Sequence, residues 1–75
     1  MDNKTREVLK FLVKNKDNNS TLSLDIDEIS SKFGITSKEL DKILHSLNNS
    51  QIIECHFSIG TYREMTVFSN ANDYI

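Results

Sequence analysis

A glycine between two helix-start patterns is the feature of this sequence that most restricts its fold. Residues 25–28 read DIDE, an acidic N-cap candidate with a glutamate three positions later, and residues 36–39 read TSKE with the same capping-box spacing. Gly34 lies between them, and glycine readily takes the left-handed conformation in which helices often end. The sequence therefore predicts helices over residues 25–34 and 36–49, joined by a very short turn.

Apolar residues recur at helical spacing in three segments. Each set occupies one side of its helix, which is typical of an amphipathic helix packed on a core. An additional helix is therefore predicted over residues 3–16. The apolar positions are Val8, Leu9, Leu12 and Val13 in the first segment, Ile26, Ile29 and Phe33 in the second, and Leu40, Ile43, Leu44 and Leu47 in the third.

The last third of the chain changes to the period of a strand. Ile53, Cys55 and Phe57 alternate with polar residues, and β-branched and aromatic residues follow after Gly60, so a β-hairpin is predicted over residues 52–69 with Gly60 at its tip. Pairing of Ile53 with residue 67 or with residue 68 gives a plausible turn in either case. The register therefore stays open, because a one-residue slip exchanges the two faces.

Two short segments complete the predicted organisation. Residues 21–24 alternate and are suited to a brief strand, whereas residues 70–75 form a polar tail that ends in Tyr74 and Ile75 and either frays or docks on a neighbour. At 75 residues the chain has room for a single domain, 1–75, with one small core. The predicted fold class is α+β.

Composition excludes several classes of function. One cysteine forms no internal disulfide, and two histidines are too few for a conventional zinc site, so no metal or cofactor is expected. No paired acid and base or activated nucleophile is apparent, which argues against an enzyme and leaves no catalytic residue to name. The sequence has no secretory signal pattern and no apolar run of membrane-spanning length, so a cytoplasmic protein without a membrane partner is expected.

The cysteine and its neighbour have simple structural interpretations. Because Cys55 alternates with Ile53 and Phe57, it is expected to be a small buried hydrophobe. His56 falls on the other face of the hairpin, where it is expected to be solvated or packed across the strands.

The order of helix, short strand, helix, tight turn, helix and hairpin resembles the winged helix-turn-helix family of DNA-binding domains. The resemblance covers essentially the whole chain and rests on residues 24–36, on Leu40, Leu44 and Leu47, and on Ile52 and Ile53 leading into the hairpin. It implies a three-helix fold whose C-terminal two-stranded hairpin is the wing, with a possible third strand at residues 21–24. A small bacterial or mobile-element transcriptional regulator, acting as a homodimer on double-stranded DNA, is the function that it implies.

In such a protein the helix over residues 36–49 enters the major groove and the wing touches the backbone beside it. The predicted DNA contacts are the polar side chains opposite the apolar stripe of that helix and at the hairpin tip. They are Ser37, Lys38, Lys42, His45, Ser46, Asn49, Thr61, Tyr62 and Arg63.

Other interpretations compete with duplex binding. The net charge of −2 and the acidic Glu39 and Asp41 favour a protein–protein adaptor on the same fold. A replication-associated module that binds single-stranded DNA is a further alternative, in which Phe57 or Tyr62, if exposed, stacks on bases. Polar residues on a helix surface are also often merely solvated.

The charge is unevenly distributed. Residues 1–16 hold five basic and two acidic residues, a local charge of +3, which leaves −5 for the remainder. Arg6, Lys10 and Lys14 lie along one side of the first predicted helix, where they either contact phosphate or form a solvated face. This helix and the tail with Tyr74 and Ile75 form the predicted dimer surface.

Overall fold

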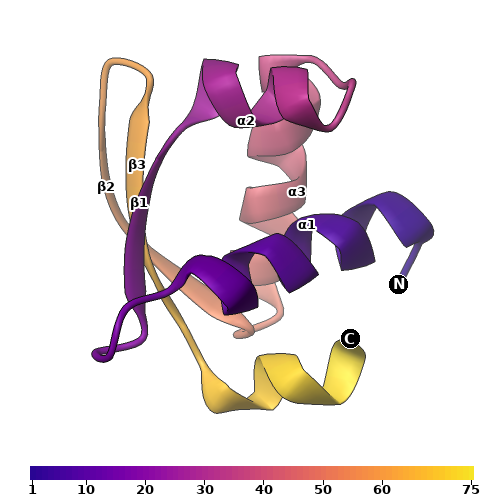
Figure 1. The fold of residues 1–75 in the computed structure, drawn as a ribbon, viewed down its shortest axis with the longest axis vertical. Helices are drawn as coiled ribbons and strands as arrows, with labels where there is room; N and C mark the ends of the chain where they lie inside the picture. The colour runs from indigo at the N-terminus through magenta and orange to yellow at the C-terminus, as the bar shows by residue number, and fades with distance from the viewer.

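The computed structural model describes all residues 1–75, and it is an α+β structure in which a three-stranded antiparallel sheet packs against helices (Figure 1). Predicted and observed helices agree closely, although the helix predicted over residues 25–34 is shorter at both ends in the structure. Along the chain the elements are α1 (Asn3–Asn15), β1 (Thr21–Asp25), α2 (Ile26–Lys32), α3 (Ser37–Asn49), β2 (Ile53–Ile59), β3 (Tyr62–Val67) and the 3₁₀ helix η1 (Ser69–Tyr74).

The sheet has the order β1-β3-β2, so the brief strand suggested for residues 21–24 is a full member of it. Leu24 stands opposite Arg63 on β3, and Ile53 of β2 stands opposite Val67, which resolves the register left open by the sequence. The central strand β3 thus joins the segment between the first two helices to the C-terminal hairpin.

A two-residue turn connects β2 and β3. Ile59 and Tyr62 are the last paired residues, and Gly60 has a φ of +58°. Among the two turn residues only Gly60 has a positive φ, the pattern of a type II′ turn, which matches the twist of the flanking strands. The glycine predicted at the hairpin tip is therefore required by the backbone conformation.

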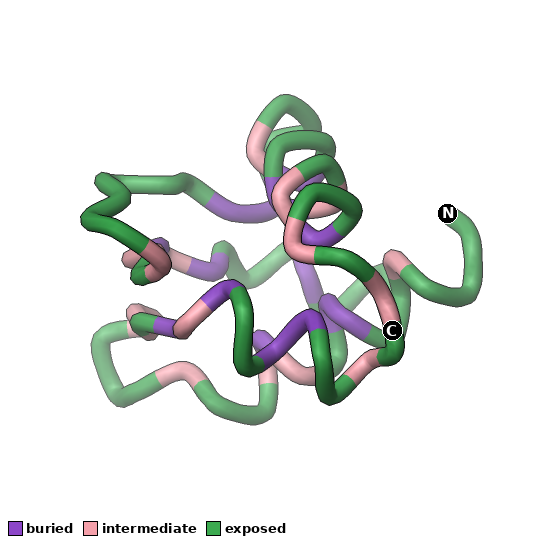
Figure 2. The backbone as a smooth tube through the Cα atoms, turned by 90° about the horizontal axis from the view of Figure 1, so that it is seen from above, coloured by how far each residue is buried: buried purple, intermediate pink, exposed green.

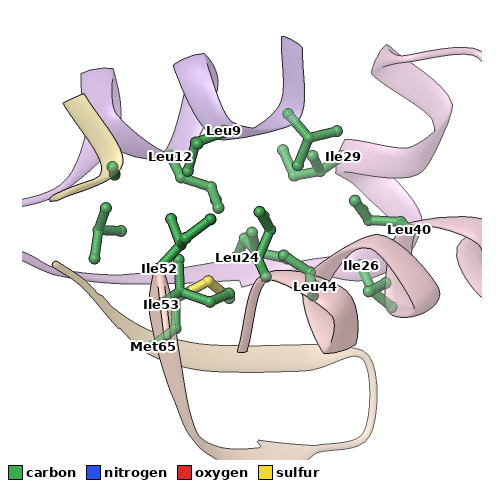
Figure 3. Close-up of a cluster of buried hydrophobic side chains, with 14 residues drawn as sticks. Leu9, Leu12, Leu24, Ile26, Ile29, Leu40, Leu44, Ile52, Ile53 and Met65 are labelled. Carbon is green, nitrogen blue, oxygen red and sulfur yellow. The ribbon is translucent and has the colours of Figure 1, made fainter. Parts of the chain in front are cut away.

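One core lies between the helices and the inner face of the sheet (Figure 3). Leu9 and Leu12 of α1, Leu40 of α3 and Met65 of β3 are completely or almost completely buried there. The tube in Figure 2 shows that buried segments face inward from every layer. All fourteen core residues are hydrophobic: Val8, Leu9, Leu12, Leu24, Ile26, Ile29, Leu40, Leu44, Leu47, Ile52, Ile53, Met65, Val67 and Ala71.

The turn between α2 and α3 has the caps that the sequence suggests. Gly34 has a φ of +68°, its N–H donates to the Ser31 carbonyl, and the Ile35 N–H donates to the Ser30 carbonyl, which together form a Schellman motif. Thr36 and Glu39 then form a complete capping box at the start of α3. A chain reversal of this kind orients α3 across α2.

At the start of α2 only half of the suggested capping box is present. The Asp25 carboxylate accepts from the backbone N–H groups of Asp27 and Glu28, but the Glu28 side chain returns no bond to Asp25. Asp25 is also the last residue of β1, where it is paired with Tyr62. Its backbone therefore belongs to the sheet rather than to a free helix end.

The C-terminal tail docks on its own chain. Residues 69–74 form η1, Ala71 is buried in the core, and the Arg6 Nε donates to the Tyr74 carbonyl. Figure 1 shows this segment alongside α1. Tyr74 and Ile75 remain about half exposed.

The expectation that Cys55 is buried is wrong. Cys55 is exposed although it pairs with the buried Met65 and keeps the inward direction of Ile53, because at this position the space between β2 and α3 is an open groove. The tip of the hairpin lies level with the ends of α2 and α3 in Figure 1. Cross-strand packing of His56, by contrast, is confirmed by a hydrogen bond between its ring and the Thr66 hydroxyl.

The C-terminus of α3 is a second Schellman motif, formed without glycine. The Gln51 N–H donates to the Asn48 carbonyl and the Ile52 N–H donates to the Leu47 carbonyl, while Gln51 has a φ of +60°. A side chain in this left-handed conformation costs about 1–2 kcal/mol.

We therefore expect Gln51→Gly to raise the free energy of unfolding by about 1 kcal/mol, as measured by urea denaturation. Ser50→Gly is the matched control, because Ser50 has a φ of −84° and glycine there adds only unfolded-state entropy. A Gln51→Gly protein that is less stable than the wild type would contradict the strain at this position.

Candidate nucleic-acid interface

The outer face of α3 carries five of the sequence-predicted site residues. All five are exposed, and they lie on the side of the helix opposite the buried Leu40, Leu44 and Leu47. They line one shallow hollow together with Asp41 and Ser50. The five are Lys38, Lys42, His45, Ser46 and Asn49.

Both lysines of this face are free of intramolecular partners. Neither the Lys38 nor the Lys42 ammonium forms an ion pair or a hydrogen bond within the chain. Two ammonium groups, an imidazole, a hydroxyl and an amide therefore remain available to an external ligand. Such groups match phosphate oxygens and the donors and acceptors at base edges.

The two carboxylates near these lysines are both engaged. Glu39 accepts from the Thr36 N–H at 3.3 Å and from the Thr36 hydroxyl at 3.2 Å, so it serves the helix cap. Asp41 accepts two bonds from the Arg63 guanidinium. Arg63 offsets the charge of Asp41, whereas the bonds to the neutral Thr36 leave the charge of Glu39 in place.

Arg63 links the hairpin to α3. Its Nε and Nη2 each donate to an Asp41 carboxylate oxygen at 3.2 Å, and its Nη1 donates to the Gly60 carbonyl at 2.9 Å and the Tyr62 carbonyl at 3.1 Å. The pair is bidentate and the Arg63 side chain is only 21% exposed. Arg63, predicted as a DNA contact, is thus occupied by intramolecular bonds that hold the hairpin tip against the helix.

Two further polar contacts, not anticipated from the sequence, fix the position of α3. The Asn48 side chain accepts from the Cys55 N–H at 2.9 Å and joins α3 to β2. Ser37, a predicted DNA contact, instead donates its hydroxyl to Asp27 and lies against the buried Ser30 hydroxyl. No periodicity signals these contacts, because each joins residues that lie seven or more positions apart.

Two of the predicted wing residues, Thr61 and Tyr62, lie apart from the outer face of α3. Tyr62 is 58% exposed on the outer face of the sheet, and Thr61 occupies the turn, where its carbonyl accepts from the Ile26 N–H. Ile59 pairs directly with Tyr62, and Phe57 lies two residues along the same strand, so all three side chains share the outer face. We call this exposed group, Phe57, Ile59 and Tyr62, the wing patch.

A groove runs between α3 and β2, and Phe57 of the wing patch also lines it. Its walls include His45, Cys55 and the Asp41–Arg63 pair. Partial burial raises the pKa of the Cys55 thiol, the charge of Asp41 raises it further, and the Arg63 guanidinium acts in the opposite direction. Cys55 is therefore mainly a thiol at neutral pH and a poor nucleophile.

No three or more His, Cys, Asp or Glu side chains gather in a way that could hold a metal ion. None of the helices combines the length and apolarity of a membrane span. Comparisons with protein-family models, with curated proteins and with solved structures found no match.

The Asp41–Arg63 pair gives a direct prediction about the link between hairpin and helix. A double-mutant cycle of Asp41→Ala and Arg63→Ala, followed by urea unfolding, should give a coupling free energy of about 1 kcal/mol, because the pair is bidentate and partly shielded. The coupling should shrink at high salt. Single effects that simply add in the double variant would show that the pair contributes nothing to stability.

Proposed function

We propose that this protein is a winged helix-turn-helix domain that binds double-stranded DNA, with the outer face of α3 in the major groove. The β2–β3 hairpin is the wing beside it. Regulation of transcription is the role that suits so small a module. Two copies would then read two half-sites, because one module buries little surface.

The arrangement of elements supports this assignment. Three helices and a three-stranded antiparallel sheet follow one another in the order of that family, with α2 and α3 joined by a turn that contains a left-handed glycine. The first strand is paired with β3, so the wing has a fixed origin beside α2. Proteins with a fold of this kind have several different functions, so the function has to be inferred from the residues of the binding face.

The single observation that carries the proposal is the composition of the α3 outer face. Lys38 and Lys42 are exposed and unpaired, whereas Glu39 and Asp41 are tied to Thr36 and Arg63. This local patch answers the objection from the net charge of −2. Phosphate affinity depends on the charges at the contact surface more than on the total.

The positions along α3 suggest a division of roles. Lys38 and Lys42 lie in its N-terminal half, the part of a recognition helix that contacts base edges and nearby phosphates. Asn49 is its last residue and suits an adenine or a backbone contact at the other end. Arg63 positions the wing in this scheme and does not contact DNA.

A protein–protein adaptor is the second candidate, and the wing patch favours it. Phe57, Ile59 and Tyr62 are each at least half exposed and lie together, with Glu54 and Glu64 on the same face of the sheet. Acidic neighbours repel phosphate, so this face suits a protein better than single-stranded DNA. An apolar interface of this kind would also be insensitive to salt.

The decisive test is a titration of a labelled random duplex pool, beside a single-stranded pool, over a range of salt concentrations. The wild type should prefer the duplex and lose affinity steeply as salt rises. Lys38→Gln/Lys42→Gln should lower the slope of log K against log salt by about 2, because each phosphate contact contributes about 0.9.

Glu54→Gln/Glu64→Gln is the matched control on the outer face of the sheet, and it should leave duplex affinity unchanged or slightly higher. Absence of binding to either pool at about 100 µM protein, the weak end of non-specific affinity, would contradict the proposal. Salt-insensitive association abolished by Phe57→Ser/Tyr62→Ser would indicate the adaptor instead.

A further inference from the structure

A second basic hollow lies between α1 and α2, on residues that the proposed DNA interface does not use. Lys10 and Lys14 are exposed on successive turns of α1, about 6 Å apart along its axis. Lys32, at the end of α2, joins them across the hollow. Three ammonium groups therefore converge from two helices that are separate in the sequence.

The charges around this hollow are strongly one-sided. Glu7 is the only carboxylate in its lining, and it is paired with the Lys4 ammonium at 3.9 Å. Arg6, which the sequence groups with Lys10 and Lys14, is directed away instead, with its Nε bonded to the Tyr74 carbonyl. The basic cluster in the structure therefore contains Lys32 and not Arg6.

An aromatic pair fixes the floor of the hollow. The Phe11 and Phe33 rings meet edge to face with centroids 5.7 Å apart, and the Lys32 Nζ lies 4.8 Å from the Phe11 ring centroid. A cation–π contact of this kind holds an ammonium in place without neutralising its charge. Lys32 is therefore both positioned and available to an anion.

The hollow faces away from the outer face of α3. Val8, Leu9 and Leu12 place one side of α1 against the core. The buried side of α3 packs against the same core. Lys10 and Lys14 lie on the opposite side of α1. The two basic hollows accordingly have no lining residue in common.

We propose that this hollow is a second binding surface for the phosphate backbone of a nucleic acid. Three ammonium groups in a shallow depression fit successive phosphates, and the Asn15 side-chain N–H there already donates to the Phe11 carbonyl. An anionic lipid surface is less suited, because Phe11 and Phe33 are packed on the core and only partly exposed.

Together with the proposed function, this surface gives the protein two phosphate-binding faces. One molecule then holds two duplexes at once, a sequence-reading contact through α3 and a sequence-independent contact through α1 and α2. The second face does not depend on the first, because the residues that form it are separate.

The test compares wild type, Lys10→Gln/Lys14→Gln/Lys32→Gln and Lys38→Gln/Lys42→Gln in two assays. Titrations of a random duplex pool over a range of salt should show two duplexes bound by each wild-type molecule and one by the triple variant, with the salt slope of the remaining α3 site unchanged. Bead-bound duplex should capture a second, labelled duplex through the wild type, and neither variant should bridge. Circular dichroism spectra and urea midpoints confirm that the variants fold.

Glu7→Gln is a matched variant that should change duplex affinity in the opposite direction. Loss of the one carboxylate in the hollow should raise duplex affinity about twofold, as for one exposed charge pair. This variant keeps the hypothesis testable if the triple variant proves unstable.

The two proposals fail separately. If the triple variant still binds two duplexes and bridges them, the second surface is refuted while the α3 interface stands. If the triple variant loses binding and the α3 variant matches the wild type, the α3 interface fails and the second surface stands. Binding to phosphatidylserine vesicles that depends on Lys10, Lys14 and Lys32, with duplex binding unchanged, would overturn the nucleic-acid assignment in favour of a lipid surface.

Discussion

The pairing of β1 with β3 is the interaction on which the rest of this structure depends. It joins the segment between α1 and α2 to the C-terminal hairpin, and it is extended by the bond from the Ile26 N–H to the Thr61 carbonyl at 2.7 Å. Leu24 enters the core from β1 and Met65 enters it from β3. Without this pairing the hairpin would be an isolated two-stranded ribbon, which is marginally stable in water.

From this frame the position of α3 follows in three steps. The Gly34 turn orients α3 across α2, the leucines on the inner face of α3 pack on the core, and Asn48 and Asp41 bind the hairpin at two points. The outer face of α3 is then held at a fixed distance from the wing.

The elements signalled locally could be predicted from the sequence. Gly34, Thr36 and Glu39 define a turn and a cap within six residues, so the helix boundaries there were predicted almost to the residue. The exposed positions of Lys38 and Lys42 followed from helical periodicity alone.

Features that depend on distant contacts could not be predicted. Cys55 lies in an open groove beside α3 rather than in the core, and nothing in the alternation of β2 indicates that groove or the bulge that follows Cys55. Arg63 and Asp41 lie 22 residues apart, so their pairing appears only once the sheet and α3 are in place. The docking of the tail on α1 through η1 is a tertiary contact of the same kind.

The acidic balance of the chain is compatible with basic faces because many of its acids have structural roles. Asp2 and Asp25 accept backbone N–H groups at helix N-termini, where the helix dipole offsets part of a negative charge. The bond from the Thr5 N–H keeps the pKa of Asp2 below its ordinary value. The Asp17 carboxylate accepts from the N–H groups of Asn19 and Thr21 and so stabilises the loop before β1. Lysines such as Lys38 and Lys42 have no comparable partners, so positive charge is left free on the outer face of α3.

The central claim is that duplex DNA lies on the outer face of α3, and amide chemical shifts measured during a titration with a short duplex test it most directly. The largest changes should fall on residues 37–49, with smaller changes at Gly60 and Thr61 and none on the strand face formed by Phe57 and Ile59. Changes confined to the wing patch, or an absence of changes along α3 at saturating duplex, would contradict the account.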